Sequence, residues 1–326
     1  MAARSPRPSP PHVRASKRRD DVATDTAGVA DALRELCRDV RRDEPLHRHV
    51  SFRIGGPADV LVVPRSLEEL RDVALHLFRE AIGFIVLGAG SNVLVSDLGI
   101  GGVVLKVGKG VDHVRIDGET VVAASGAGLP ALAKLSAARG LAGLEFSAGI
   151  PASVGGAVVM NAGAHGHAMA EVVRVARIVT AEGEQTLPAE ALRFAYRTSA
   201  LQAVRCVVLE ATLQLTRSDP AQVRGRMEAW LRQRGETQPL GPPSSGCIFR
   251  NPAGDHAGRL VDLAGGKGMA VGGARVSEVH ANYIVNTGRA TAADVAALMD
   301  KVSAMVMEKF RVRLEPEIKF LGDFRH

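Results

Sequence analysis

The spacing of hydrophobic residues predicts alternating helices and strands over the first ninety positions. A first amphipathic helix is indicated by apolar residues at helical spacing, namely Val29, Leu33, Leu36 and Val40. Residues 58–63 form a short apolar run and are expected to be a strand. Residues 66–78 follow as a helix that opens with a capping box at Ser66. A second strand at 84–87 leads into the glycine-rich residues 88–92, so a strand–helix–strand unit delivers a tight loop.

From about residue 93 the predicted strands become shorter and are separated by glycines. Asp117-Gly118 is typical of a two-residue hairpin turn, and a helix is expected at 130–139. Within the glycine-rich region 147–166, residues 153–157 are expected to be a loop, because each glycine inside a helix costs roughly 1 kcal/mol relative to alanine. The strands of this part are expected at residues 103–107, 114–116, 121–125, 172–179 and 205–215.

The last third of the chain is predicted to contain two long helices and a final strand. One helix begins at Asp219-Pro220, with aspartate as the N-cap and proline at the first helical position. A proline- and glycine-rich loop follows at 238–246, then a helix from Thr291 and a strand at 315–321. The fold class is α+β. Its predicted parts are a disordered basic tail at 1–24, lobes at 25–92 and 93–218, and a third domain at 219–326.

Composition and charge restrict the possible classes of function. Hydrophobic residues make up 46% of the 326 positions, which is normal for a globular protein. The formal net charge is +6, and it is accounted for by residues 1–19, which contain no acid and six basic residues, Arg4, Arg7, Arg14, Lys17, Arg18 and Arg19. The remainder is formally neutral, which argues against a nucleic-acid-binding face. The tail itself could touch RNA or an anionic membrane, but its composition is typical of disorder.

Cysteine usage and hydropathy indicate a cytoplasmic protein. Cys37, Cys206 and Cys247 have neither CxxC nor paired spacing, so we expect reduced thiols and neither a disulfide framework nor a metal site. No apolar run approaches the roughly 20 residues needed to cross a bilayer. Residues 1–24 lack the apolar core of a secretion signal. No membrane association and no obligate protein partner are implied.

Two glycine-rich segments indicate a bound dinucleotide. Gly88 and Gly90 follow a buried strand, where glycine lets backbone N–H groups approach a diphosphate. The nicotinamide-type pattern GxGxxG fails because Val93 takes its third glycine position, so a plain NAD-binding domain is the poorer interpretation. Residues 153–157 form the second segment, which indicates either close helix–strand packing or a second wall of the cofactor site. Two such segments in separate lobes favour a long cofactor clamped between them.

Seven segments, in order, resemble the UDP-N-acetylenolpyruvoylglucosamine reductase (MurB) family. They are SFRIGGPADVLV (51–62), GAGSNVLVSD (88–97), GIPASVGGAVVMNAGA (149–164), YRTS (196–199), SGCIFRNP (245–252), HANYIVN (280–286) and EPEIKFLG (315–322). The length and the compact last third resemble the family's second type, which lacks an extra tyrosine-bearing substrate loop. The resemblance implies a two-lobed FAD-binding fold of the vanillyl-alcohol-oxidase (PCMH) kind, with lobes at 25–92 and 93–218. It also implies a C-terminal α+β substrate-binding domain at 219–326.

The resemblance further implies that FAD lies between the lobes without a covalent link. Residues of the first loop are expected near its diphosphate, namely Gly88, Gly90, Ser91 and Asn92. Ser153, Gly155 and Gly156 are expected to approach the flavin from the second lobe. Arg53 is expected to shape the cofactor pocket.

The family reaction reduces UDP-N-acetylglucosamine enolpyruvate to UDP-N-acetylmuramate, a peptidoglycan precursor, with NADPH as the hydride donor. Hydride passes through FAD to the methylene carbon of the enol ether, and the adjacent carbon finally receives a proton. Such chemistry needs a cation to stabilise the transient anion and a positioned proton donor. Arg197, in YRTS, matches the family's active-site arginine. A guanidinium suits this role because it holds a carboxylate bidentately and keeps its charge.

Glu317, the second glutamate of EPE, matches the family's catalytic glutamate. On a strand Glu315 would point to the same face, so only the family pattern favours Glu317. Cys247 takes the place of the usual serine proton donor, since the family's GS-x-FKNP reads Gly-Cys-Ile-Phe-Arg-Asn-Pro at 246–252. A thiol, with a reference pKa of about 8.5, releases a proton more easily than an alcohol, and this predicts sensitivity to alkylation. The open alternative is an inert cysteine, with water or Glu317 donating instead.

Three more residues are candidate substrate contacts. Asn251 matches a family position that touches the substrate, and Arg250 beside it replaces the common lysine and keeps its charge. Asn282 in HANYIVN is expected to contact the sugar nucleotide. Tyr196 either contacts the substrate or packs.

Two other classes of function remain as alternatives. An FAD-dependent oxidase of a small alcohol or hydroxy acid would share the cofactor fold, but it would have no use for Arg197, Cys247 and Glu317 together. A nucleotide-sugar sensor or an RNA-binding module led by the basic tail would explain neither glycine-rich segment.

Overall fold

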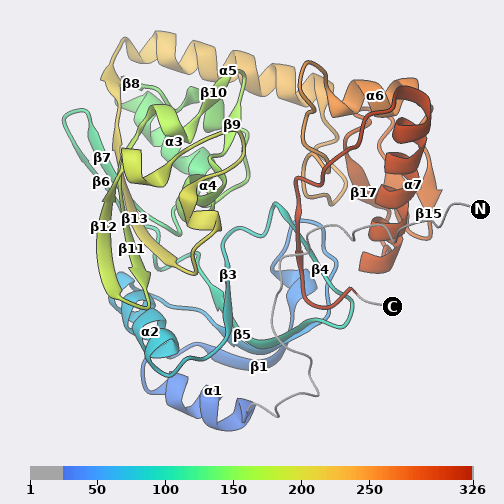
Figure 1. Cartoon of the computed structure of the whole chain (residues 1–326). Helices are drawn as coiled ribbons and strands as arrows, with labels where there is room; N and C mark the ends of the chain where they lie inside the picture. The colour runs from blue at the N-terminus through green and yellow to red at the C-terminus, as the bar shows by residue number, and fades with distance from the viewer. Residues whose placement is uncertain (1–24, 325–326) are drawn as a thin grey trace, which may run out of the picture.

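The computed structural model describes residues 25–324, so the tail predicted at 1–24 lies outside the described residues. The α+β class is confirmed. Lobe 1 lies at the bottom of Figure 1, lobe 2 at the upper left and the third section at the right. Helix α5 (Pro220–Thr237) runs along the top from lobe 2 toward the third section. None of the helices in the described part of the chain is long and apolar enough to cross a membrane.

Lobe 1 is built on a four-stranded sheet with the order β1-β2-β5-β3. Because β5 (Ile100–Lys106) is an inner strand of this sheet, the lobe extends past the predicted boundary at residue 92 and includes residues 93–106. Strands β2, β5 and β3 are parallel to one another, and β1 pairs antiparallel with β2. The elements of this lobe are α1 (Thr26–Arg34), β1 (Val40–Pro45), η1 (Leu46–Arg48), β2 (Pro57–Val62), α2 (Leu67–Arg79), β3 (Phe84–Leu87) and β5 (Ile100–Lys106). The parallel pairs place the carboxyl ends of β3 and β5 side by side, at the edge where the first glycine loop begins.

Helix α2 ties the two lobes together. The predicted N-cap is confirmed, because the Ser66 hydroxyl accepts the Glu69 N–H at 3.1 Å. The Glu69 carboxylate accepts the N–H of Arg65 rather than that of the cap itself. Leu70 and Leu77 of α2 are buried in one core that contains residues from the sheets of both lobes. This shared core holds the lobes in a fixed relation.

The first helix is shorter than predicted. It ends at Arg34, and Val40 is the first residue of β1, where it pairs with Val62 of β2. The apolar side chain of Val40 fits a helical period, but this β-branched residue pairs with a neighbouring strand in the sheet. Tertiary pairing therefore overrides the local pattern.

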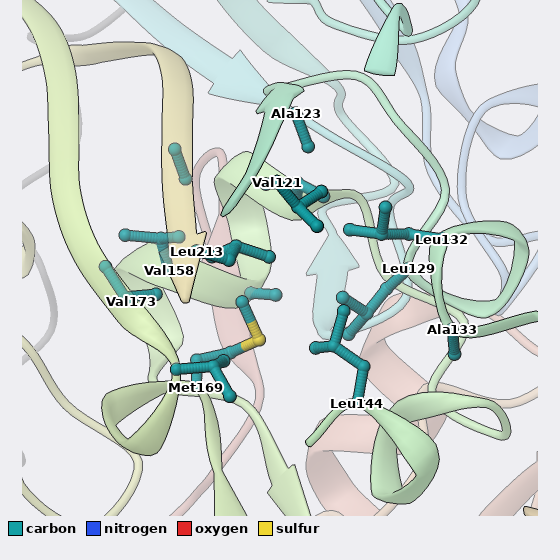
Figure 2. Close-up of a cluster of buried hydrophobic side chains, with 14 of the residues drawn as sticks. Val121, Ala123, Leu129, Leu132, Ala133, Leu144, Val158, Met169, Val173 and Leu213 are labelled. Carbon is teal, nitrogen blue, oxygen red and sulfur yellow. The ribbon is translucent and has the colours of Figure 1, made fainter. Parts of the chain in front are cut away.

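Lobe 2 is a five-stranded antiparallel sheet with the order β12-β11-β13-β7-β6. The predicted hairpin at Asp117-Gly118 is confirmed by the pairing of Asp117 with Thr120. The main elements are β6 (Val114–Asp117), β7 (Thr120–Ala124), α3 (Leu129–Ala138), α4 (Val154–Met160), β11 (Val173–Thr180), β12 (Gly183–Pro188) and β13 (Val207–Gln214). Figure 2 shows the core of this lobe, where Leu129 and Leu132 of α3 face Val158 of α4 and Leu213 of β13.

The expectation of a loop at 153–157 is wrong, because Val154–Met160 form helix α4. Ser153 is the N-cap of this helix, and its hydroxyl accepts the Gly156 N–H at 3.4 Å. Gly155 is required by close packing, since a side-chain carbon there would lie 2.8 Å from the Ser125 Cβ. The glycines lower the intrinsic stability of helix α4, but they allow its close approach to β7.

The third section contains a three-stranded antiparallel sheet, β15-β16-β17, covered by α6 and α7. Its elements are α6 (Ala257–Leu263), β15 (Ala270–Val271), β16 (Ala274–Val276), β17 (Ile284–Asn286), α7 (Ala292–Phe310) and β18 (Lys319–Leu321). Short elements complete the chain, namely β4 (Val93–Val95), β8 (Leu141–Ala142), η2 (Glu145–Ser147), β9 (Gly163–Ala164), β10 (His167–Ala168), η3 (Met169–Glu171), η4 (Ala189–Leu192), η5 (Ala200–Gln202) and β14 (Thr216–Arg217). The boundary at residue 219 stays a prediction, and α5 buries Val223 and Met227 in the core of lobe 2.

The terminal strand is shorter than the predicted 315–321. Only Lys319–Leu321 pair as β18, in parallel with β4. Pro316 forms an isolated bridge with Phe249 instead. As a result Glu315 is exposed and Glu317 is buried, so the expectation that both glutamates share one face is wrong. The structure separates two residues that periodicity could not.

The third section is anchored to lobe 1 by a carboxylate at a helix terminus. Asp97 Oδ1 accepts the Ala292 N–H at 2.9 Å, and Oδ2 accepts the Ala293 N–H at 3.1 Å. These N–H groups open α7 and have no partner within the helix, and the negative charge suits the helix dipole there.

Asp97→Ala is expected to destabilise the protein by about 1 kcal/mol, because it removes this cap. The measurement is the midpoint of urea denaturation. Asp300→Ala, an exposed change within the same helix, serves as the control and should leave the midpoint unchanged. Equal midpoints for both variants would contradict an anchoring role for Asp97.

Candidate active site

The two glycine-rich segments meet at one point between the lobes. The first follows β3, and a side-chain carbon at Gly88 would lie 2.5 Å from the Ser153 Oγ of lobe 2. The Gly155 N–H donates to the Ser125 carbonyl at 2.8 Å, which holds α4 against the end of β7. The sequence suggested a cofactor clamped between two such segments, and the structure brings Gly88, Ser153 and Gly155 together.

The polar groups around this junction fit a dinucleotide. Within residues 25–324, the backbone N–H groups of residues 89–92 have no protein acceptor, as expected of a loop that binds a diphosphate. The Ser125 hydroxyl is buried there without a hydrogen-bond partner, and such a group calls for a ligand or water. A pocket of about 300 Å³ adjoins the loop at Ala89 and is also lined by Arg48 and His49. FAD therefore fits these residues.

Arg53 is less clearly placed with respect to the cofactor. Its backbone is in the left-handed region (φ 55°), and its side chain is exposed. It does not line the pocket beside Ala89. Its contribution to the cofactor site stays a prediction.

Arg197 faces Glu317 at the boundary between lobe 2 and the third section. The Arg197 Nε lies 2.9 Å from the Glu317 Oε1, although this N–H does not have hydrogen-bond geometry. The Arg197 Nη1 donates to the Gly163 carbonyl at 2.7 Å. The backbone of Arg197 is left-handed (φ 55°), a strained state for a non-glycine residue that is frequent at functional sites. Two chain segments and one strained residue thus fix this guanidinium.

Lys319 and Gln202 support Arg197 from behind. The Lys319 Nζ donates to the Gln202 Oε1 at 3.0 Å, and the Gln202 amide donates to the Arg197 carbonyl at 3.0 Å. Neither supporting residue was found from the sequence. Because this relay joins η5 to the last strand, only the tertiary structure reveals it.

Burial raises the pKa of Glu317, and the charges of Arg197 and Arg250 oppose this rise. The net direction is upward, so the carboxyl keeps a proton more readily than an ordinary glutamate does. Its backbone is held on both sides, because the Glu317 N–H donates to the Ile248 carbonyl at 2.7 Å. The Asn92 amide donates to the Glu317 carbonyl at 3.2 Å.

Asn92 therefore has a different contact from the one expected near the diphosphate. Its side chain holds the Glu317 backbone, and its carbonyl accepts the Lys319 N–H at 2.9 Å. The glycine loop and the candidate catalytic carboxylate are thus joined directly. Ser91, between Gly90 and Asn92, is half-buried in the same loop.

Cys247 lies next to this pair. It forms a β-bridge with Tyr283, and the following residue, Ile248, accepts the Glu317 N–H. Burial raises the pKa of the Cys247 thiol to about 11; the Glu317 charge adds to the rise, while Arg197 and Arg234 oppose it. A thiol with this pKa stays mostly protonated near neutral pH, so we expect its alkylation there to be slower than an ordinary cysteine's.

The candidate substrate contacts divide into two groups. Asn251 and Asn282 line a pocket of about 380 Å³ beside Cys247. The Asn282 amide is buried and both donates to and accepts from the Phe249 backbone, at 2.8 and 2.9 Å. The Asn251 Oδ1 accepts the Ala257 N–H at 3.0 Å. Each amide thus has a structural partner already, and contact with the substrate stays a prediction.

Tyr196 is 54% exposed, which excludes packing in a core. Its ring lies beside the Arg197 guanidinium, 5.6 Å from centroid to Cζ. An exposed aromatic ring next to the candidate catalytic arginine is free to contact a ligand. Contact of Tyr196 with the substrate stays a prediction.

One charged residue of the site was missed from the sequence, although a signal for it was present. Lys106 interrupts the apolar run 103–107 of a buried strand, and its Nζ donates to the Gly88 carbonyl. A lysine within such a run is rarely buried without a reason.

Two family models match the chain. Residues 58–187 match the FAD binding domain, and residues 238–321 match the C-terminal domain of UDP-N-acetylenolpyruvoylglucosamine reductase. The matched ranges cover the two glycine-rich segments and the loop that carries Cys247. They confirm the FAD-binding fold and make the small-substrate oxidase an unfavoured interpretation.

Similar proteins agree with these matches along nearly the whole chain. UDP-N-acetylenolpyruvoylglucosamine reductase 2 of Symbiobacterium thermophilum is 47% identical over 299 residues, which are 90% of this chain and 97% of the relative. The Bacillus subtilis reductase is 46% identical, with coverages of 88% and 95%. The crystal structure of the Thermus caldophilus enzyme (MurB) superposes with a TM-score of 0.76 at 34% identity, covering 87% of this chain and 98% of that one. The chain thus belongs to the UDP-N-acetylenolpyruvoylglucosamine reductase family.

Proposed function

We propose that Arg197, Cys247 and Glu317 perform the second half of the reaction of this FAD-containing, NADPH-dependent reductase. The reaction converts UDP-N-acetylglucosamine enolpyruvate to UDP-N-acetylmuramate for peptidoglycan synthesis. One observation carries the proposal: a guanidinium and a buried carboxyl lie 2.9 Å apart beside the thiol loop. Bound FAD supplies the hydride carrier between NADPH and the substrate.

Arg197 is proposed to hold the substrate carboxylate and to stabilise the anion that forms next to it. Its Nε faces Glu317 and its Nη1 donates to Gly163, which leaves Nη2 for the ligand. The Gln202 amide holds the Arg197 backbone, and the Gly163 carbonyl and the Glu317 carboxyl hold the guanidinium. A fixed cation needs no reorganisation when negative charge develops, and this is the main source of electrostatic catalysis.

Glu317, in its protonated form, is proposed to stabilise the developing anion. Burial favours that form, and a protonated carboxyl can donate a hydrogen bond to an oxyanion. The Asn92 and Ile248 contacts fix its backbone, so its position relative to the glycine loop is constant. Glu315, which is exposed, has no such environment.

Cys247 is proposed as the donor of the final proton. A thiol pKa of about 11 ensures that the proton is present at neutral pH, and it remains a far better acid than a serine hydroxyl. The site holds two nearby arginines, Arg197 and Arg234, that stabilise the thiolate left after transfer. Water then returns the proton between turnovers.

The nucleotide part of the substrate is proposed to occupy the 380 Å³ pocket beside Cys247. Arg259 and Lys267 line this pocket and suit a diphosphate, although both already pair with aspartates. The asparagines of the pocket wall suit the sugar or the base. We propose a cytoplasmic location, because NADPH and nucleotide sugars are cytoplasmic reagents and the chemistry needs reduced thiols.

Glu317→Gln is expected to slow reoxidation of the reduced flavin by the enolpyruvyl nucleotide by roughly 10²- to 10⁴-fold. Reduction of the flavin by NADPH should continue, because Glu317 is assigned to the second half-reaction alone. Anaerobic stopped-flow absorbance at the flavin band separates the two steps. Glu315→Gln is the matched control and should keep the wild-type rate. Loss of both half-reactions in Glu317→Gln, or equal effects at the two positions, would count against the assignment.

Cys247→Ala is expected to lose roughly 10²- to 10⁴-fold in the same reoxidation step, since the proton donor is removed. Cys247→Ser should recover most of that rate, because a hydroxyl at this position can also donate. Cys206→Ala, at a half-buried thiol outside the site, is the control. If Cys247→Ala reoxidises at the wild-type rate, the proton comes from another group.

Alkylation of Cys247 by iodoacetamide is expected to be slow at pH 8, where roughly one thiol in a thousand is ionised for a pKa of about 11. The rate should rise about tenfold for each pH unit up to about pH 10. Peptide mass spectrometry resolves Cys247 from the other thiols, Cys37 and Cys206, whose pKa values burial also raises to about 11. Rapid labelling at pH 7 would refute the protonated state assigned to this thiol.

A further inference from the structure

Lys106 is a half-buried cation, and the described residues 25–324 place no carboxylate against it. It ends β5, and burial lowers the pKa of its ammonium to about 8. Among residues 25–324, no carboxylate lies within ion-pair distance of it, and its Nζ donates to the Gly88 carbonyl. A buried ammonium that lacks an anion is costly, and natural proteins rarely keep one without a use.

The position of Lys106 indicates which anion is missing. In the parallel pair of β3 and β5, Lys106 is in register with Leu87, the last residue before the glycine loop. Its side chain lines the 300 Å³ pocket together with Arg48 and Ala89. The backbone N–H groups of residues 89–92, which have no protein acceptor in the described chain, open onto the same loop. Ammonium, guanidinium and free N–H groups together make an anion site.

We propose that Lys106 is the counter-charge of the FAD diphosphate. The inference rests on the FAD-binding function given above and adds a residue that the glycine motif does not contain. Its contact with the Gly88 carbonyl holds the ammonium at the mouth of the loop. The bound diphosphate then balances the charge of Lys106 and accepts hydrogen bonds from the backbone N–H groups of residues 89–92.

A purely structural role for Lys106 and a role in binding the diphosphate predict opposite effects of its removal on the stability of the FAD-free chain. If the ammonium served only to tie β5 to Gly88, its removal would destabilise the protein with and without FAD. If it serves the diphosphate, a neutral side chain relieves the burial cost in the FAD-free chain and weakens FAD binding. The sign of the change in the FAD-free chain therefore separates the two roles.

Protonation gives a second signature. The pKa of about 8 applies to the FAD-free chain, and an adjacent diphosphate raises it. FAD affinity should accordingly be nearly constant below about pH 7 and fall by about tenfold between pH 7 and pH 9 as the ammonium is lost. The other titratable groups that face the pocket are Arg48 and His49, and His49 pairs with Glu44 at 2.8 Å.

The test measures FAD dissociation constants of the full-length chain by equilibrium dialysis with FAD fluorescence at pH 7, 8 and 9. Lys106→Met is expected to weaken FAD binding roughly 10- to 100-fold at pH 7, as for loss of a charged hydrogen bond. It should also abolish the fall in affinity toward pH 9. Lys106→Arg should restore affinity and show no pH dependence. Lys109→Gln, an exposed lysine three residues away, is the control and should match the wild type.

Thermal melts of the same proteins keep the inference testable if a variant binds no FAD. Lys106→Met should melt at the same or a higher temperature than the wild type without FAD, and it should gain less on addition of FAD. A lower melting temperature without FAD, an unchanged dissociation constant, or an equal loss in Lys109→Gln would overturn the assignment. A wild-type chain that binds no FAD would instead refute the FAD-binding function itself.

Discussion

The pairing of β18 with β4 is the constraint on which the site depends. It returns the end of the chain to the loop that follows β3, so that Asn92 holds the backbone of Glu317. The cofactor loop and the candidate catalytic carboxyl are consequently parts of one hydrogen-bonded unit. Lobe 2 supplies Arg197 from the other side, and the ion pair of Arg197 with Glu317 joins lobe 2 to this unit. Three parts of the fold therefore converge on a few backbone atoms.

Charge burial explains both ends of the cofactor cleft. Glu317 is buried with one guanidinium beside it, and its pKa rises because desolvation outweighs that attraction. Lys106 is half-buried and its ammonium donates to a carbonyl, and its pKa falls for the same physical reason. In the proposed complex the substrate carboxylate would balance the charge of Arg197, and the diphosphate would balance that of Lys106.

Close packing explains why glycines are placed where the lobes meet. A side-chain carbon added at Gly88 would lie 2.5 Å from the Ser153 Oγ, and one added at Gly155 would lie 2.8 Å from the Ser125 Cβ. The close-packing interpretation of the second glycine segment is confirmed, since Gly155 packs α4 against β7. Ser153 lies beside the first loop, and its role as a wall of the cofactor site stays a prediction. The helix there was missed because its propensity is poor, and tertiary contact compensates for it. The same competition shortened the first helix, where Val40 joined the sheet.

The sequence by itself determined the elements with strong local signals, the three-part α+β order and the family. Caps at Ser66, Asp219 and Thr291 and the hairpin at Asp117-Gly118 are local, because the groups that satisfy them lie within a few residues. Only the tertiary structure decided between Glu315 and Glu317, raised the pKa of Cys247 and revealed Lys106 as an unpaired charge. Burial and electrostatic environment depend on segments distant in the chain, such as 92 and 317, and no periodicity within either segment records that they meet.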